Sequence, residues 1–491
     1  MVAAACLVAE DHHPWFCPAG WWLSSVTGKD TNTAMNDQRY DHEPDRPGAR
    51  RVRSRWWAVG LAGMTGLALT TTAVGIGGAP AIGAVDGILT AADDRRGKPD
   101  RASTDNKGHE GKATKDKHKG TPVPCDADAL IAAITLANAR GGAVLDLAKG
   151  CTYLLTANID GAGLPAITAP ITLNGGKDTS ITRAAAAEPF RILTVDTGGD
   201  LTLNKLKITG GQISDDDSDG GGILVEAGGA ARINHSEIVR NIASNGDGGG
   251  IATLGITTIK KSAVNRNTAG LYGGGIYSTG SLIIKKSHVE ANNASSGGGG
   301  VASVEGTAQI EHSTISGNQS NQGGGMFAED GVTSTVLDTR ITRNTASVSG
   351  GGIILGDGQL AMRRSILAAN TAGSGDGGGL HVDDGSVTVT DSIIKANTAI
   401  ASNGGGFFND GEMTLFNTKV TGNTANQGGG LYNDSFDVLV LFHTAVVDNL
   451  AITDGGGIFN DGGTVELNTA TGTTVVKNRP NNCVNVTGCP G

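Results

Sequence analysis

Apolar side chains recur at fixed places in a repeat of 25 to 27 residues that runs from Ser236 into the C-terminal region. Each copy contains a Ser or Thr anchor, an apolar residue three positions before it and another two positions after it. A run of at least three Gly follows, and the next residue is again apolar. Such short, largely β-branched segments between Gly, Asn and Asp predict three strands per repeat. The anchors are Ser236, Ser262, Ser287, Ser313, Thr339, Ser365, Ser392, Thr418 and Thr444.

Self-similarity at this period predicts a solenoid. Three strands per repeat describe an all-β fold, a parallel β-helix of about a dozen coils, in which each coil stacks on the previous one at roughly 4.8 Å. The apolar positions would then form interior columns. The Gly runs suit tight corners, where a left-handed backbone is inexpensive only without a side chain.

An Asn stands five residues after every anchor. A buried amide must be hydrogen-bonded, and stacked identical Asn side chains satisfy one another. We therefore predict a structural Asn ladder inside the solenoid. Its members are Asn241, Asn267, Asn292, Asn318, Asn344, Asn370, Asn397, Asn423 and Asn449.

These coils, of which SAVNRNTAGLYGGG at Ser262–Gly275 is an example, resemble a known family, the right-handed parallel β-helix repeat proteins with a pectin-lyase-like fold. The Asn-x-Ala…Gly-Gly-Gly-Ile pattern is similar to the repeats of polymorphic outer membrane proteins. The resemblance covers roughly residues 125–489 and implies a right-handed coil. Because this fold carries lyases, hydrolases, adhesins and proteins with no known activity, it implies no single function.

Composition divides the chain into four parts. We interpret residues 1–45 as an unstructured extension or as sequence ahead of the true start, for which Met35 is a candidate. Residues 46–84 join a basic segment to a long apolar run and predict a signal peptide; an uncleaved membrane anchor is the alternative. Residues 85–124 are charged and polar and predict a disordered linker, and residues 125–491 form the β-helix domain.

The domain is predicted to begin with a helix that covers the first coil. Asp126 or Asp128 can cap it, Leu130, Ile131, Ile134 and Ala137 share one face, and Gly141 can end it. Such a cap would cover strand edges that the end of a parallel stack exposes.

Four Cys follow the predicted signal peptide, namely Cys125, Cys151, Cys483 and Cys489. An even number in an exported protein favours disulfides, and the simplest pairing joins neighbours at each end of the domain. We expect an extracellular or cell-surface monomer that meets a membrane only through an uncleaved signal segment. The net charge of −10 provides no basic footprint, so nucleic acid is not an expected partner.

An acidic residue follows most of the Gly corners, usually with Gly next to it. Asp-Gly is ordinary turn chemistry, and a row of weak Ca²⁺ sites is the alternative, since hard cations take carboxylate oxygens. No other cofactor or metal site is predicted. The acidic positions are Glu305, Asp330, Asp357, Asp384, Asp410, Asp434 and Asp461.

The second residue after each Gly run should face outward, and in many copies it is aromatic. An exposed aromatic stripe could stack on the sugar rings of a polysaccharide or cell-wall glycan; alternatively, neighbouring side chains shield one another. The candidate glycan-binding residues are Tyr277, Phe327, His381, Phe408, Tyr432 and Phe459.

Catalysis finds less support, and we assign no catalytic residue. The resemblance implies a Gly-His-Gly segment for hydrolases, which the sequence lacks, and a Lys or Arg base for lyases. Lys261 and Lys286 occupy the same place in adjacent coils, as do Arg240 and Arg266, which predicts a basic region there. The leading hypothesis is a non-catalytic binding or structural surface for polysaccharide. The alternative is a polysaccharide lyase, or a glycoside hydrolase, acting on uronate-containing glycans.

Overall fold

The structure, a computed structural model, describes residues 120–214 and 218–490. The predicted extension, the signal peptide and residues 85–119 of the predicted linker lie outside the described residues. Strand β1 (Thr121–Val123) occupies the last part of the range assigned to the linker and pairs with β2 (Ala143–Leu147). The described fold therefore begins a few residues ahead of Cys125.

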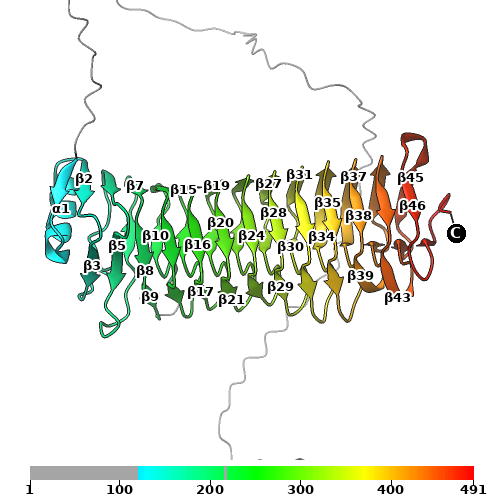
Figure 1. Cartoon of the computed structure of the whole chain (residues 1–491), viewed down its shortest axis with the longest axis horizontal. Helices are drawn as coiled ribbons and strands as arrows, with labels where there is room; N and C mark the ends of the chain where they lie inside the picture. The colour runs from blue at the N-terminus through cyan, green and yellow to red at the C-terminus, as the bar shows by residue number, and fades with distance from the viewer. Residues whose placement is uncertain (1–119, 215–217, 491) are drawn as a thin grey trace, which may run out of the picture. The chain divides into compact units, whose positions relative to one another are not determined.

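The described chain forms a right-handed parallel β-solenoid of about 14 turns, as Figure 1 shows. The named strands pair with their counterparts in the next coil in parallel register; Ile233 pairs with Ile259, and Ile259 with Ile284. The predicted fold class is confirmed. A regular coil has four strands, one more than predicted. The additional strand is only two residues long and places a single small side chain inside, such as Ala269, so periodicity alone does not reveal it.

The strands form four ladders along the solenoid. The first comprises β6 (Leu193–Val195), β10 (Ile223–Val225), β14 (Ile251–Thr253), β18 (Ile276–Ser278), β22 (Val301–Val304), β26 (Met326–Glu329), β30 (Ile353–Leu355), β40 (Leu431–Asn433), β44 (Ile458–Asn460) and β47 (Cys483–Val484). The second comprises β1, β2, β4 (Pro170–Asn174), β7 (Asp200–Asn204), β11 (Ala230–Asn234), β15 (Ile256–Lys260), β19 (Ser281–Lys285), β23 (Thr307–Glu311), β27 (Thr333–Leu337), β31 (Gln359–Arg363), β41 (Val438–Phe442) and β45 (Thr464–Asn468). Two long strands, β34 (Leu380–Thr390) and β37 (Phe407–Phe416), belong to both ladders and join them into one sheet.

The third ladder has 13 strands and the fourth has 10. The third comprises β3 (Thr152–Leu155), β5 (Ser180–Arg183), β8 (Lys207–Thr209), β12 (Glu237–Val239), β16 (Ala263–Asn265), β20 (His288–Glu290), β24 (Thr314–Ser316), β28 (Arg340–Thr342), β32 (Ile366–Ala368), β35 (Ile393–Lys395), β38 (Lys419–Thr421), β42 (Ala445–Val447) and β46 (Thr474–Val476). The fourth comprises β9 (Gln212–Ile213), β13 (Ile242–Ala243), β17 (Thr268–Ala269), β21 (Asn293–Ala294), β25 (Gln319–Ser320), β29 (Thr345–Ala346), β33 (Thr371–Ala372), β36 (Thr398–Ala399), β39 (Thr424–Gln427) and β43 (Leu450–Asp454).

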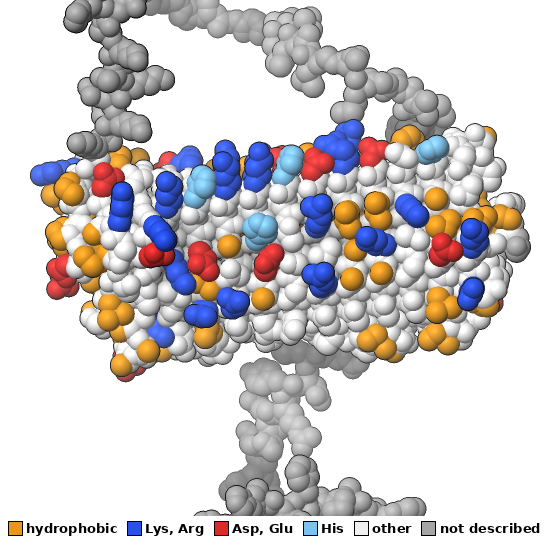
Figure 2. Space-filling model, viewed as in Figure 1, with side chains coloured by type: hydrophobic (Ala, Val, Ile, Leu, Met, Phe, Trp, Pro, Cys, Tyr) orange, Lys and Arg blue, Asp and Glu red, His pale blue; other side chains and the backbone are white. Residues whose placement is uncertain are grey.

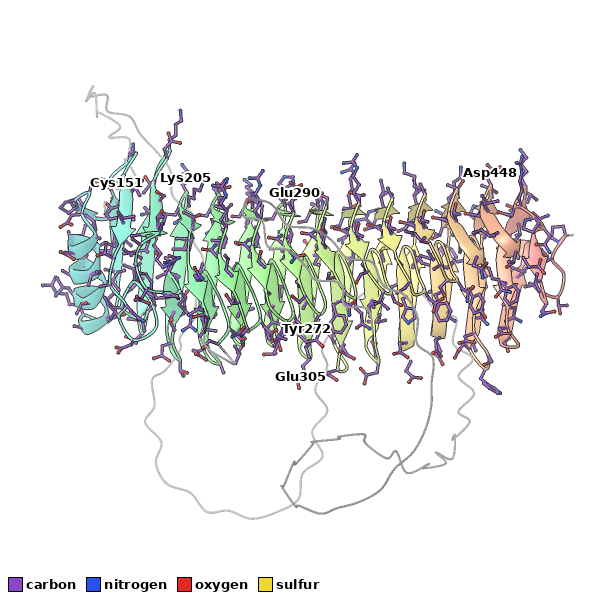
Figure 3. The ribbon with its side chains drawn as sticks, turned by 90° about the horizontal axis from the view of Figure 1, so that it is seen from below. Cys151, Lys205, Tyr272, Glu290, Glu305 and Asp448 are labelled. Carbon is purple, nitrogen blue, oxygen red and sulfur yellow. A yellow bond between two sulfur atoms is a disulfide. The ribbon has the colours of Figure 1, made fainter. Side chains whose placement is uncertain are left out.

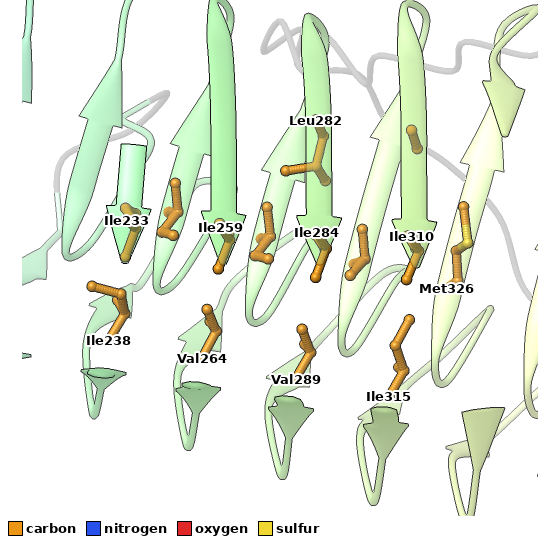
Figure 4. Close-up of a cluster of buried hydrophobic side chains, with 14 of the residues drawn as sticks. Ile233, Ile238, Ile259, Val264, Leu282, Ile284, Val289, Ile310, Ile315 and Met326 are labelled. Atoms are coloured by element: carbon orange, nitrogen blue, oxygen red, sulfur yellow. The ribbon is translucent and has the colours of Figure 1, made fainter. Parts of the chain in front are cut away.

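The core consists of stacked aliphatic columns. Ile259, Ile284 and Ile310 lie one above another, and Val264 and Val289 form a facing column (Figure 4). All five are 0% exposed. Burial of each such side chain stabilises the fold by roughly 1.5 to 3 kcal/mol, so the stacking of identical positions supplies the main driving force.

Helix α1 (Ala127–Ala139) lies at the N-terminal end of the stack (Figure 1). Asp126 is its N-cap residue, and Leu130, Ile134 and Ala137 are buried and join the same hydrophobic core as the strands. Gly141 follows the helix with φ of 77°. In the described residues, no helix is long and apolar enough to cross a membrane.

Candidate functional site

The predicted Asn ladder lies in the interior, and its nine side chains are at most 1% exposed. Asn318 is representative. Its Nδ2 donates to Oδ1 of Asn344 at 3.0 Å and to the carbonyl oxygen of Val289 at 3.0 Å. Its backbone N–H donates to the same Oδ1 of Asn344. Each buried amide is thus satisfied by neighbouring coils, and the ladder holds the coils in register without facing any ligand.

The ladder has a tenth member that sequence analysis missed. Asn449 donates from Nδ2 to Oδ1 of Asn478 at 3.0 Å. Asn478 stands five residues after Thr473, so the local spacing is preserved. The interval from Thr444 is longer because the 3-10 helix η1 (Thr469–Thr471) intervenes, and no Gly run follows Asn478.

Both pairs of Cys form disulfides within the ends of the solenoid. Cys125 is bonded to Cys151 with a Cα–Cα distance of 5.6 Å, and Cys483 to Cys489 with a Cα–Cα distance of 6.3 Å. Each bond constrains a terminal segment, which has a neighbouring coil on one side only.

The aromatic stripe exists as a column, but the expectation that it is exposed is wrong. Phe327, Phe408 and Tyr432 are buried, with exposures of 3%, 7% and 6%, and Tyr277, His381 and Phe459 are half-buried. From His381 to Phe459 the rings stack in series, with centroid distances of 4.9, 5.0 and 5.2 Å. The alternative of mutual shielding therefore describes these side chains, and most of each ring face is unavailable to a sugar.

The Gly corners explain the burial. Gly377 and Gly428 have φ of 68° and 61°, and each turns the chain back over the outward residue four positions later. A Cβ on Gly377 would lie 2.7 Å from Cβ of His381, and one on Gly428 would lie 2.9 Å from Cβ of Tyr432. Burial also lowers the pKa of His381, because the charged imidazolium loses solvation.

Tyr272 lies beside this column, with its ring centroid 5.2 Å from that of Phe327. Figure 3 shows Tyr272 and the acidic residue Glu305 on the side of the solenoid opposite Lys205 and Glu290. Glu305, Asp330 and Asp384 have left-handed backbones, as Asp-Gly turn chemistry predicts. In the described chain, no three His, Cys, Asp or Glu side chains are grouped so that they could hold a metal ion. For Glu305, Asp330 and Asp384 the backbone geometry fits the turn interpretation.

The side chains of Asp410 and Asp437 interact electrostatically. Burial, followed by repulsion from Asp410, raises the pKa of Asp437 to about 7, and burial also raises the pKa of Asp410. No third His, Cys, Asp or Glu side chain of the described residues is grouped with this pair so that the three could hold a metal ion.

The opposite side carries a row of residues that we call the corner column. It comprises the residue immediately before each anchor, together with Lys205, which precedes Leu206 at the equivalent position of an earlier coil. These residues turn the chain between the second and third ladders, and all have φ between 46° and 55°. Figure 2 shows Lys, Arg and His side chains standing along this edge. The members are Lys205, His235, Lys261, Lys286, His312, Asp338, Arg364, Asp391, Asn417 and His443.

Over the N-terminal half of the solenoid, the corner column lines a groove of about 810 Å³ that we call the corner groove. The groove is lined by five lysines, against two carboxylates, Asp178 and Glu237. His235 and His288 also line it. A chain with a net charge of −10 thus concentrates positive charge in one place. The lysines are Lys177, Lys205, Lys207, Lys261 and Lys286.

Backbone geometry does not account for the lysines. A left-handed backbone costs most residues about 1 to 2 kcal/mol, and only Gly, and to a lesser degree Asn and Asp, adopts it readily. In the C-terminal half, Asp338, Asp391 and Asn417 follow that preference, whereas Arg364 and His443 do not. In the N-terminal half the same position holds Lys or His in five consecutive coils, at a conformational cost.

The two halves also differ in pairing. Lys205, Lys261 and Lys286 are exposed and form no ion pair with any described residue. By contrast, Nε and Nη2 of Arg364 donate to Oδ1 and Oδ2 of Asp338 at 2.9 and 2.7 Å. This pairing holds the pKa of Asp338 below its usual value. The corner column is thus paired toward the C-terminus and unpaired in the groove.

Sequence analysis identified Lys261 and Lys286 as a basic region but not the groove. Lys177, Lys205 and Lys207 lie in the irregular first coils, which lack the Asn that marks the others. Arg240 and Arg266 do not line the groove. The available signal was the residue before each anchor, which carries Lys or His from Lys205 to His312.

No family model, curated protein or solved structure matches this chain. The resemblance noted in the sequence is therefore supported at the level of the fold alone, a parallel β-solenoid of about 14 turns.

Proposed function

We propose that this protein is an exported, non-catalytic β-solenoid that presents a long binding surface to polysaccharide. The observation that carries the proposal is the repetition itself. Successive coils place equivalent side chains on the outer surface at intervals of roughly 4.8 Å, so a polymer with its own repeat can meet the same chemistry several times. Repeated weak contacts of this kind add up through effective concentration.

Three further points support an exported surface protein. Residues 46–84 have the composition of a signal peptide. The two disulfides belong in an oxidising compartment. The Asn-x-Ala…Gly-Gly-Gly-Ile coils resemble those of polymorphic outer membrane proteins and of pectin-lyase-like β-helices. A monomer outside the cell or at its surface fits this proposal.

The test is retention of the full-length protein on a panel of insoluble polysaccharides, with an unrelated protein of similar charge as the control. We expect retention on at least one polysaccharide and no release of sugar. If nothing in the panel retains the protein while its circular dichroism spectrum remains that of a β-protein, the proposal is wrong.

A second candidate is a lyase for uronate-containing glycans, favoured by Lys261 and Lys286, which lie side by side in the groove. A lysine serves as a general base only when its surroundings favour the neutral amine, and both side chains are exposed. Absorbance of unsaturated products, measured with and without Ca²⁺, distinguishes the two functions. Turnover that is lost on changing either lysine to Ala would replace the binding proposal with the lyase.

A further inference from the structure

The corner groove has the form of a charge ladder. Lys261 and Lys286 precede anchors in adjacent coils, with Lys205 and His235 in the two coils before them. Adjacent coils are roughly 4.8 Å apart, so the ammonium groups of the three lysines stand in a line parallel to the solenoid axis. Repulsion along such a line is unfavourable in the free protein and is relieved when a line of negative charges lies against it.

We infer that the corner groove binds a linear anionic polysaccharide that runs along the solenoid axis. The inference rests on the proposed function and names the site and the class of polymer. Three observations meet here: a groove, a line of three lysines (Lys205, Lys261 and Lys286) that form no ion pair in the described chain, and a left-handed backbone that disfavours those same side chains. Of the other groove lysines, Lys207 lies 3.8 Å from Glu237.

The chemistry of the lining selects among polyanions. Grooves for single-stranded nucleic acids combine positive charge with aromatic rings on which the bases stack. No Phe, Tyr or Trp lines the described groove, whose lining includes only Leu206 and Ala263 as apolar residues. A protein interface normally has an apolar or aromatic centre, which this lining also lacks. A polymer that offers charge and hydroxyl groups without an apolar face fits best.

The groove uses Lys and not Arg, which bears on the kind of anionic group that it can bind. Lysine is a compact point charge on a flexible stem, whereas arginine is a rigid fork that matches one planar anion. The groove lining contains no Arg. The site therefore recognises the spacing of negative charges more than the identity of each anion, and both carboxylated and sulfated polysaccharides belong to the expected class.

The test measures binding of the full-length protein to oligosaccharides of heparin, which is sulfated, and of alginate, which is carboxylated, in the presence of a chelator. Neutral dextran and single-stranded DNA are the comparison ligands. We expect both anionic sugars to bind, with affinity that falls as salt is added, because screening weakens exposed charge pairs. Dextran should not bind at this site, and DNA should bind more weakly than either sugar.

The matched variants are Lys261→Glu with Lys286→Glu, and Lys395→Glu with Lys419→Glu. Lys395 and Lys419 are exposed, like Lys261 and Lys286, but they lie on the third ladder outside the groove. Both double substitutions change the net charge by the same amount. We expect the groove pair to weaken binding at least about tenfold and the control pair to leave it almost unchanged. If the groove pair does not fold, Lys261→Asn with Lys286→Asn removes the charges with residues that suit the backbone.

Three outcomes would overturn the inference: equal loss in both pairs, binding insensitive to salt, or DNA bound as tightly as the sugars. If another polysaccharide retains the protein while the groove variants bind normally, the groove is not the site but the proposed function survives. If no polysaccharide is retained at all, both fail.

Discussion

The N-terminal half of the solenoid, from Lys205 to His312, and the C-terminal half, from Asp338 to His443, share a backbone but not a surface. Corner φ values lie between 46° and 55° in both, and the same Asn ladder runs through both. In the first half, the corner residues Lys205, Lys261 and Lys286 line a groove without ion-pair partners in the described chain. In the second, Arg364 is held by Asp338, and Asn417 donates to Asp391 at 2.7 Å. The interior repeat is thus set by stacking, and the outer positions are free to differ.

The aromatic column also differs between the two halves, and here the C-terminal half has the more continuous row of side chains. In the C-terminal half, His381, Phe408, Tyr432 and Phe459 form a continuous stack. In the N-terminal half, the same register includes Ala252 and Ala302 between larger residues. We interpret the aromatic column as packing that stabilises one half, and the cationic corner as a surface kept available in the other.

The interior should be equally important in both halves. Asn292→Ala and Asn397→Ala each leave buried partners of the amide unsatisfied. At about 1 to 3 kcal/mol for each orphaned group, either change should lower the free energy of unfolding by at least about 2 kcal/mol. Chemical denaturation followed by circular dichroism measures this. A large loss in one half and none in the other would mean that the halves do not share one structural core.

The aromatic column should matter for stability and not for ligand binding. Phe408→Ala removes a ring that stacks on both neighbours, and we expect a loss of about 3 kcal/mol, near the lower limit for buried Phe. Phe416→Ala is the control, because Phe416 is 49% exposed. Retention on polysaccharide should be unchanged in the folded variant. Weaker retention with unchanged stability would restore the aromatic column as the glycan site.

The smallest expected effect is the change in stability when a corner lysine is replaced by a residue that suits the left-handed backbone. Lys261→Asn places a residue that tolerates the left-handed backbone, so we expect a gain of up to about 1 kcal/mol in stability. The same variant should bind anionic sugar more weakly. Thermal melting and binding are measured on one preparation. A variant that melts below the wild type would show that Lys261 contributes to folding, and the contrast between the halves would lose its functional meaning.

Much of the fold followed from the sequence because identical coils repeat one local pattern. The spacing of Ile259 and Val264 around Ser262 fixed their inward orientation, and the Asn five residues after each anchor identified the ladder. Asn478 was missed because its coil contains an inserted turn. The candidate site was anticipated only at Lys261 and Lys286, since Lys177, Lys205 and Lys207 lie in coils that lack the ladder Asn.

By itself, the sequence determined which side chains face inward and that equivalent positions stack, because a period that matches one coil leaves a single register in which apolar residues meet. Only the tertiary structure decided what becomes of the outward positions. Phe408 is buried because the Gly404 corner folds back over it, whereas Lys261 remains open because its corner is tight and nothing crosses it. The burial of Phe408 and the exposure of Lys261 both depend on where the neighbouring turns lie in three dimensions. The alternation of apolar and polar residues along the chain does not specify that.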